Sequence, residues 1–328
     1  MHRDSLILST IISVILLPLL ILLSPSESFS EHTKGKTYLT GIIRPNVKLQ
    51  NIVDGFKAGM ELYGFREGEN ISYIQTNDIS DIDSVVEKMI EMKVDLIFTM
   101  TADTTRKTLK KLAGRPVPVI FGGIYDPIAS GIVKSLSVPG DNVTGVMIGG
   151  STEKAFEWLL KAVPHAKKIY VPFSSESDTV AICMSVLKKS AEKSRVELMT
   201  SKTDTLHELT VALASIPGKA DAIFIPNSPF LITNLETIIK FAAEHKLPTG
   251  SGTGQYKNGI MITYGQDHFY TGKIASRLAS SVLHDRIPAA SLPVETTEYF
   301  LGINLQTATT VGITVPDSIL QQASFIVR

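Results

Sequence analysis

Two patterns of hydrophobic and polar residues take turns along residues 37–284. Short apolar runs rich in β-branched and aromatic residues, such as Thr37–Ile43 and Asp95–Met100, predict buried strands. Between these runs, apolar residues recur every three or four positions, as in residues 47–63, which predicts helices with one buried face. Strands that alternate with helices over short connections predict parallel sheets covered on both faces, with right-handed crossovers.

The alternation occurs twice in tandem, with a second cycle beginning after residues 142–146. In the first cycle we predict strands at Thr37–Ile43, Asn70–Gln75, Asp95–Met100 and Val117–Phe121, and helices at 47–63, Asp81–Met92 and Asp103–Leu112. In the second cycle we predict strands at Lys168–Phe173, Val196–Thr200, Asp221–Pro226 and Gly259–Tyr264, and helices at Thr152–Val163, Asp178–Lys193, Leu206–Ile216, Leu235–His245 and 270–284. Thr152 is a candidate N-cap. For the tail we predict a strand at Tyr299–Asn304 and a helical segment near Ser318–Phe325.

Two similar units predict an α/β protein made of two doubly wound, Rossmann-like lobes with parallel sheets and a ligand cleft between them. We expect residues 36–145 and 265–291 in lobe one, and residues 146–264 and 292–328 in lobe two. Ligands of such sheets bind at the carboxyl ends of the strands, and clefts between domains are preferred sites for small molecules. The loops that follow the strands are therefore the candidate functional site.

The N-terminus changes this picture because Leu6–Leu23 contains no charged residue. His2 and Arg3 precede the run and a stretch of small residues up to Ser30 follows it, a pattern typical of a secretory signal peptide. We expect residues 1–30 to be removed and the mature protein to be periplasmic. The run is also long enough to span a bilayer, so an uncleaved membrane anchor is the alternative.

Composition excludes several classes of function. The chain has 328 residues with 32 Lys+Arg, 32 Asp+Glu and one cysteine. A formal net charge of zero argues against a nucleic-acid surface, and a lone cysteine excludes a disulfide framework or a multi-cysteine metal site. Seven histidines are scattered, and no glycine-rich nucleotide motif follows a strand. We expect no cofactor, no metal and no enzymatic activity; a hydrolase that uses a cleft serine is a minor alternative.

Polar loops follow six of the predicted strands. Arg44 comes directly after the first strand, where its guanidinium can clamp a carboxylate; a solvated surface arginine is the alternative. Residues 99–105 combine threonine hydroxyls with a helix start, which predicts an anion or carboxylate cradle, with ordinary N-capping by Thr101 or Asp103 as the alternative. The remaining loops are 122–127, 173–178, 226–230 and 264–267.

One long motif carries a family resemblance. Residues 126–146 (DPIASGIVKSLSVPGDNVTGV) resemble a hallmark of one family of ABC transporter substrate-binding proteins, of the type I periplasmic-binding fold. That family includes tryptophan- and phenylalanine-binding members. Residues 264–272 (YGQDHFYTG), 304–308 (NLQTA) and 312–316 (GITVP) are similar to its later motifs. The resemblance covers roughly residues 37–326.

The resemblance implies a solute-binding component of an ABC importer. Such a protein closes two lobes on an amino acid or similar small molecule and presents it to permease subunits in the inner membrane. We expect a monomer, with a membrane-tethered sensory module as the alternative function. In place of an aspartate that family members often carry, this chain has Asn227-Ser228-Pro229. By position, the implied ligand contacts are Thr101, Ala102, Asp126, Ser174, Ser175, Asp178, Asn227, Ser228, Tyr264 and Asp267; for Asp126, a structural turn before Pro127 is an alternative role.

Overall fold

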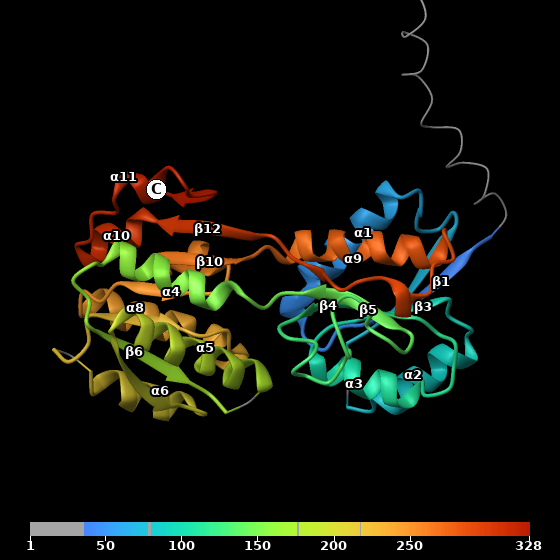
Figure 1. The fold of residues 1–328 in the computed structure, drawn as a ribbon, viewed down its shortest axis with the longest axis horizontal. Coiled ribbons are helices and arrows are strands. Elements are labelled where there is room, and N and C mark those ends of the chain that lie inside the picture. Colours follow the sequence, from blue (N-terminus) through green and yellow to red (C-terminus); the bar gives the residue numbers. More distant parts are fainter. Residues whose placement is uncertain (1–35, 78–79, 176, 217) are drawn as a thin grey trace, which may run out of the picture.

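The chain forms two α/β lobes, each built around one central sheet (Figure 1). The computed structural model describes residues 36–77, 80–175, 177–216 and 218–328. The predicted signal peptide, residues 1–30, lies outside the described residues.

The sheet of the first lobe has the strand order β11-β5-β4-β3-β1-β2, and all of its neighbours pair in parallel. Every residue of β3 is buried, because helices cover both faces of the sheet. The strands are β1 (Tyr38–Ile43), β2 (Ile71–Thr76), β3 (Leu96–Thr99), β4 (Val119–Ile124), β5 (Val143–Met147) and β11 (Glu295–Thr296).

Four long helices cover this sheet, α1 and α9 on one face and α2 and α3 on the other (Figure 1). Phe56 of α1 and Phe98 of β3 stack in the first of the two cores, with ring centroids 4.1 Å apart. The helical elements of the lobe are η1 (Val47–Leu49), α1 (Gln50–Leu62), α2 (Ile82–Glu91), α3 (Ala102–Lys111), α9 (His268–Leu283) and η3 (Ala289–Ser291).

Helices α1 and α9 approach each other closely because glycines lie where they cross. A Cβ atom on Gly272 would come 2.0 Å from the carbonyl oxygen of Ile52, and one on Gly55 would come 1.9 Å from the carbonyl oxygen of Phe269. Both neighbours are backbone atoms, so a side chain here would force the helices apart. The crossing therefore joins segments that are more than 200 residues apart in sequence.

The sheet of the second lobe has the order β13-β12-β10-β9-β8-β6-β7. Its pairs are parallel except for β10 and β12, which are antiparallel. The strands are β6 (Lys168–Phe173), β7 (Glu197–Lys202), β8 (Ala222–Ile225), β9 (Thr249–Ser251), β10 (Ile262–Gln266), β12 (Tyr299–Asn304) and β13 (Phe325–Val327).

Helices again cover both faces, with α4, α5 and α10 packed in one core and α6, α7 and α8 in the other. No helix within the described ranges is long and apolar enough to span a membrane. The helical elements are α4 (Ser151–Ala162), α5 (Asp178–Ser194), α6 (Leu206–Ala214), α7 (Pro229–Thr233), α8 (Leu235–Glu244), η2 (Gln255–Asn258), α10 (Leu305–Val311) and α11 (Asp317–Leu320).

The predicted architecture of two doubly wound lobes is confirmed, and three local predictions need correction. The helical segment predicted near Ser318–Phe325 is shorter than expected, because only Asp317–Leu320 is helical and Phe325 begins β13, which pairs with β12. Strands β5, β9, β11 and β13 and helices α7 and α10 were not predicted. Gly150 is the N-cap of α4, so Thr152 is not its cap and its hydroxyl serves another contact.

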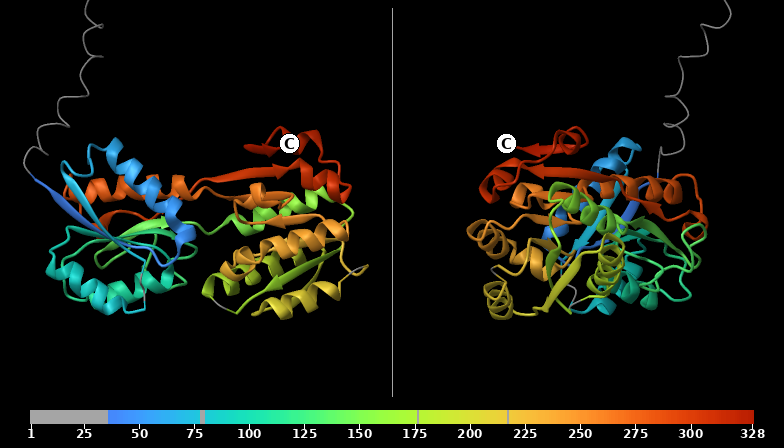
Figure 2. Two further views of the ribbon diagram at one scale, coloured as in Figure 1. Left: turned by 180° about the vertical axis from the view of Figure 1, so that it is seen from behind. Right: turned by 60° about the vertical axis from the view of Figure 1, so that its left-hand side comes forward.

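Three connections join the lobes, between β5 and α4, between β10 and α9, and between β11 and β12 (Figures 1 and 2). Strand β11 pairs with β5 of the first sheet, although residues 292–328 were expected in lobe two; β12 and β13 of that segment belong to the second sheet. We therefore propose the same lobe boundaries as before, except that the chain crosses to the second lobe after Thr296 and not after residue 291. Each crossing leaves from the carboxyl end of a strand, namely β5, β10 or the edge strand β11.

Candidate functional site

Each sheet has one point at which the strand order reverses. In the first lobe it lies between β1 and β3, and in the second between β6 and β8. Loops that leave neighbouring strands in opposite directions separate there, so a crevice forms at the carboxyl ends of the two strands. The loops at the two reversal points carry Arg44 and Thr101 in the first lobe, and Ser174 and Ser228 in the second. These four residues are the centre of the candidate site.

Arg44 is buried, although it was weighed against a solvated surface arginine. Its side chain is 6% exposed; one terminal nitrogen donates to the carbonyl of Asn46 at 3.1 Å and the other to Oδ1 of Asn77 at 2.7 Å. Its Nε has no partner, and no carboxylate of the described residues pairs with it. A buried guanidinium that has no carboxylate partner among the described residues is suited to receive a carboxylate from a ligand.

Thr101 has an unusual backbone at the start of α3. Its φ of 66° and ψ of 149° fall in a region that β-branched residues rarely occupy. The carbonyl of Thr101 accepts the hydroxyl of Thr105 at 2.8 Å, and its own hydroxyl donates to that of Thr104 at 3.1 Å. No side-chain hydrogen bond caps α3, so the alternative reading of this loop, ordinary N-capping by Thr101 or Asp103, is not observed. Ala102 follows as the first residue of the helix.

Two serines of the second lobe meet at the reversal point between β6 and β8. The hydroxyl oxygens of Ser174 and Ser228 are 3.0 Å apart and both residues are buried. Ser228 also caps α7, because its hydroxyl accepts the amide of Leu231 at 3.1 Å. Asn227, between Pro226 and Ser228, is half-buried. Hydroxyl and amide groups are thus fixed at this edge, where they can bind the polar end of a small molecule.

The loop that carries Ser175 is held by a carboxylate. Asp204 accepts the backbone amide of Ser175 at 2.7 Å and its hydroxyl at 2.8 Å, and it pairs with Lys202 at 2.9 Å. The hydrogen bond from the Ser175 amide, followed by the contacts with Lys202 and the Ser175 hydroxyl, lowers the pKa of Asp204 to about 2. Ser175 is therefore engaged within its own lobe.

We expect this carboxylate to give the folded state a dependence on acid. The pKa of Asp204 is lowered from 3.8 to about 2 on folding, so its stabilising contribution is complete above the unfolded pKa and is lost as the pH falls towards 2. The difference in urea midpoint between wild type and Asp204→Asn should therefore shrink between about pH 4 and about pH 2. Glu91→Gln, in the first lobe, controls for the loss of one negative charge. A difference that stays constant down to pH 2 would contradict the assignment.

Two polar contacts join the lobes beside these loops. Nζ of Lys48, in η1, donates to Oγ1 of Thr233, in α7, at 2.9 Å. A terminal nitrogen of Arg106, in α3, lies 3.4 Å from Oδ2 of Asp178, the first residue of α5. Asp178, a predicted ligand contact, therefore already binds the opposite lobe.

The two contacts join corresponding parts of the lobes in a reciprocal way. Lys48 follows β1 and reaches the helix after β8, whereas Arg106 follows β3 and reaches the helix after β6. Strands β1 and β6 hold the same place in their sheets, as do β3 and β8. The two contacts are thus related to each other as by a two-fold axis that runs between the lobes. This arrangement sets the loops at the two reversal points opposite each other.

A tyrosine of the first lobe is buried at the interface between the lobes. The hydroxyl of Tyr125, after β4, is 2.6 Å from that of Thr152 in α4, which in turn is 3.5 Å from Sγ of Cys183 in α5. Burial raises the pKa of Tyr125 far above its ordinary value and also raises the pKa of the Cys183 thiol. Neither group is ionised at neutral pH, so the contact is a neutral one.

The crossing segments pack around a second pair of tyrosines. The hydroxyl of Tyr299 donates to the carbonyl of Gly149, and the ring of Tyr299 stacks on that of Tyr264 with centroids 5.8 Å apart. Burial, with a smaller effect from Tyr264, raises the pKa of Tyr299 to about 12. A Cβ on Gly149 would come 2.0 Å from the carbonyl oxygen of Tyr125. Tyr264 thus lies at the crossings, packed on a neighbouring ring.

Two predicted contacts have local structural roles. Oδ1 of Asp126 accepts the amides of Ile128 and Ala129 at 3.0 and 2.9 Å, which fixes the turn at Pro127. Asp267 is the N-cap of α9 and accepts the amide of Tyr270 at 3.0 Å. Both side chains are occupied by their own loops, at the margin of the reversal points.

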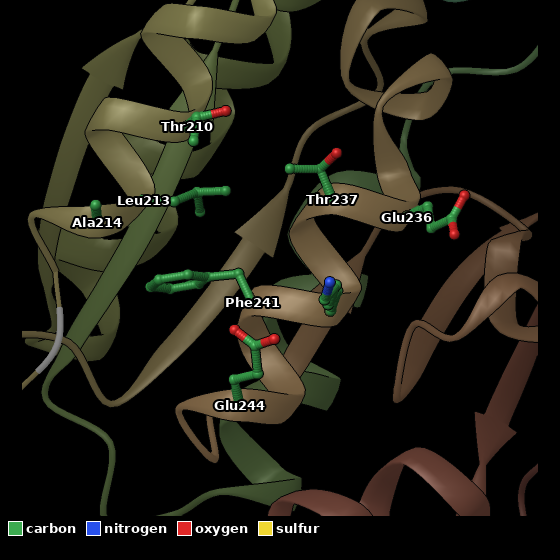
Figure 3. A pocket seen from close by; sticks show the side chains of 8 residues that line it. Thr210, Leu213, Ala214, Glu236, Thr237, Phe241 and Glu244 are labelled. Carbon is green, nitrogen blue, oxygen red and sulfur yellow. The ribbon is translucent and has the colours of Figure 1, made fainter.

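A hollow of about 410 Å³ lies elsewhere, between α6 and α8 (Figure 3). Leu213 and Phe241 form its apolar part, and Glu236 and Glu244 lie along α8 beside it. None of the predicted site residues lines it. In the part of the chain that the structure describes, no group of three or more His, Cys, Asp or Glu side chains is placed to hold a metal ion.

Sequence reasoning missed the residues that bridge the lobes. Lys48, Arg106 and Thr233 were not singled out, and Thr152 was assigned a different role. Their spacing is a usable signal, since Lys48 lies four residues after Arg44 and Arg106 lies five after Thr101. A polar residue one helical turn beyond a strand-end loop projects from the same edge as that loop.

Two lobes of this topology, joined by three crossings with polar strand ends between them, define a type I periplasmic-binding fold. A family model described as ABC transporter substrate binding protein matches residues 44–327. The chain therefore belongs to this family of ABC transporter substrate-binding proteins.

Individual proteins show how far the similarity extends. A tyrosine-binding protein of Clostridioides difficile (strain R20291) is 29% identical over 246 residues, which is 74% of this chain and 70% of that protein. A Streptococcus pneumonia protein solved in complex with L-Trp superposes with a TM-score of 0.78 at 22% identity, over 89% of this chain and 100% of that one. The ligand-free, open structure of a Clostridium difficile substrate-binding protein with adhesive properties gives 0.74 at 24% identity, over 89% and 99%.

Proposed function

We propose that this protein is the exported solute-binding component of an ABC importer and that it captures an amino acid by closure of its two lobes. The observation that carries the proposal is the pair of exchanged contacts, Lys48–Thr233 and Arg106–Asp178, which face the four strand-end loops towards one another. Membership of a substrate-binding family supports a binding role without catalysis. The permease subunits that would receive the solute, a monomeric state and a periplasmic location belong to the same proposal.

The chemistry of the four loops supports a zwitterionic ligand. Arg44 offers a buried positive charge that has no carboxylate partner among the described residues, and the start of α3 at Thr101 and Ala102 offers backbone amides at the neighbouring strand end. In the second lobe, Ser174, Asn227 and Ser228 supply hydroxyl and amide acceptors for an ammonium group. We propose an aromatic amino acid as the ligand. A tyrosine-binding protein is similar in sequence to this chain, and a protein solved in complex with L-Trp has the same fold.

A thermal-shift screen tests this function directly. Residues 31–328 would be unfolded and refolded to remove any bound solute, then heated with amino acids, organic acids, nucleosides and sugars. A ligand present at about 100 times its Kd stabilises the folded state by about 2.7 kcal/mol, which raises the melting temperature measurably. A shift confined to amino acids supports the proposal, whereas a shift confined to sugars or nucleosides contradicts the choice of ligand.

A membrane-tethered sensory module is the second candidate, because the apolar run Leu6–Leu23 is long enough to span a bilayer. The importer reading predicts a mature protein that begins near Glu31, whereas the sensory reading predicts that the apolar run is retained. N-terminal sequencing of the protein recovered from the cell envelope distinguishes the two.

A further inference from the structure

We propose that the Arg106–Asp178 and Lys48–Thr233 contacts are closure latches: they hold the lobes together before solute binds and so set how long a bound solute stays. This inference rests on the proposed function, since it assigns a regulation to the same site. It concerns the free protein first, so it can be tested whether or not the solute has been identified.

The first latch is prepared by the lobe that carries the arginine. The guanidinium of Arg106 donates to the carbonyl of Ser130 at 2.9 Å and lies 3.8 Å from Asp103, both in the first lobe. These contacts orient it towards Asp178, which is the first residue of α5. The amino end of a helix is a favourable place for a carboxylate, so Asp178 is well placed to receive the guanidinium.

The second latch is prepared in the same way from both sides. Oδ1 of Asn46 accepts the amide of Lys48 at 2.9 Å, which fixes the short turn from which the lysine extends. Across the interface, the hydroxyl of Thr233 donates to the carbonyl of Pro229 at 2.9 Å, so its lone pairs are left to accept Nζ of Lys48. No carboxylate within the described residues pairs with Lys48, so this contact is not in competition with an ion pair.

Each latch residue is attached to a loop of the candidate site. Lys48 and Asp178 lie four residues after Arg44 and Ser174, and Arg106 and Thr233 lie five residues after Thr101 and Ser228. Breaking a latch therefore separates the same loops that would surround a solute. Both latches are exposed, with side-chain accessibilities of 45% for Arg106 and 70% for Asp178, so each is weak enough to open readily.

Weak contacts suffice for this role because they act on a conformational equilibrium. Removing one latch is expected to lower the ratio of closed to open forms by about twofold to fivefold, and removing the second latch lowers it by a similar factor again. The apparent affinity for a solute that needs the closed form falls by the same factor. Because the latches oppose opening, most of this change should appear in the dissociation rate.

The test uses the double variant Arg106→Gln/Lys48→Met and a matched control, Lys111→Met/Arg115→Gln. The control also removes two cations, but both of these pair with Glu87 inside the first lobe, at 3.0 and 3.6 Å. Fluorophores would be attached at Glu91→Cys and Lys189→Cys, exposed positions on α2 and α5. Cys183 is fully buried and does not compete for the label.

Single-molecule energy transfer in the solute-free protein is expected to show a larger open fraction for the latch variant than for wild type and control. About 1 M NaCl should move wild type towards the latch variant, because it screens the Arg106–Asp178 pair. With L-tyrosine and L-tryptophan as probes, dissociation should be about fourfold to 25-fold faster in the latch variant, which lacks both latches. If neither probe binds, the proposed ligand class fails while the solute-free comparison still decides the latches. Identical solute-free distributions in all three proteins would overturn the inference.

Discussion

Replacing Arg44 with methionine is expected to raise the Kd for an α-amino acid at least about 30-fold, while leaving the solute-free protein as stable as wild type. Removing one partner of a buried charge pair costs about 2–5 kcal/mol, because the carboxylate that stays behind is buried without its counter-charge. In the solute-free protein Arg44 is 6% exposed, donates to Asn46 and Asn77, and has no carboxylate partner among the described residues, so a methionine of similar length loses two hydrogen bonds but also removes a buried charge. Affinity and stability should therefore change independently.

Calorimetric titration and urea unfolding of the same samples measure both quantities. Arg277→Met is the matched control: Arg277 lies on α9 of the same lobe and pairs with Glu295, away from the strand ends at the reversal point. Its Kd should equal that of wild type. An Arg44→Met protein that binds as tightly as wild type would remove Arg44 from the site and leave the start of α3 as the carboxylate cradle.

Replacing Gly272 with valine is expected to lower the free energy of unfolding by about 3 kcal/mol or more. The new Cβ would meet the carbonyl oxygen of Ile52 at 2.0 Å and the amide nitrogen of Phe56 at 2.6 Å, both in the backbone of α1. Backbone atoms of a packed helix cannot rotate away as a side chain can. The helices must then separate, which exposes the core residues Phe56 and Ala275 between them.

Lys188→Val, on the exposed side of α5, controls for the weaker helix propensity of valine, which alone costs less than about 1 kcal/mol. Urea unfolding monitored by circular dichroism gives both values. If the two variants lost equal stability, the close approach of α1 and α9 would not constrain the first lobe. Should Gly272→Val fail to accumulate, Gly272→Ala adds only the Cβ and keeps the comparison measurable.

The fold could be predicted because each strand and helix carries its own periodic signal. The buried runs of β3 and β8 and the amphipathic spacing of α1 are local properties of the sequence. Strand β9 was missed because Thr249–Ser251 is short and lacks the apolar residues that mark strands. Helix α10 was missed because threonines fill its middle, and Phe325 became a strand through pairing with β12, which is a tertiary effect.

The site could be predicted as far as the loops, but not as far as individual roles. Strand ends locate Arg44, Thr101, Ser174 and Ser228, because the carboxyl ends of parallel strands share one edge. That Asp126 fixes a turn and Asp267 caps α9 depends on the path of the backbone around them. The pairing of Asp178 with Arg106 depends on how the lobes are placed, which no local pattern encodes.

The crossing of α1 with α9 also has a consequence for biosynthesis. A ribosome completes α1 at residue 62 but does not supply its packing partner until residue 283, so the first lobe is without one wall of its core for most of translation. Contacts of such long sequence separation form slowly. A nascent chain of this topology therefore completes its first lobe later in translation than a chain with two contiguous domains does.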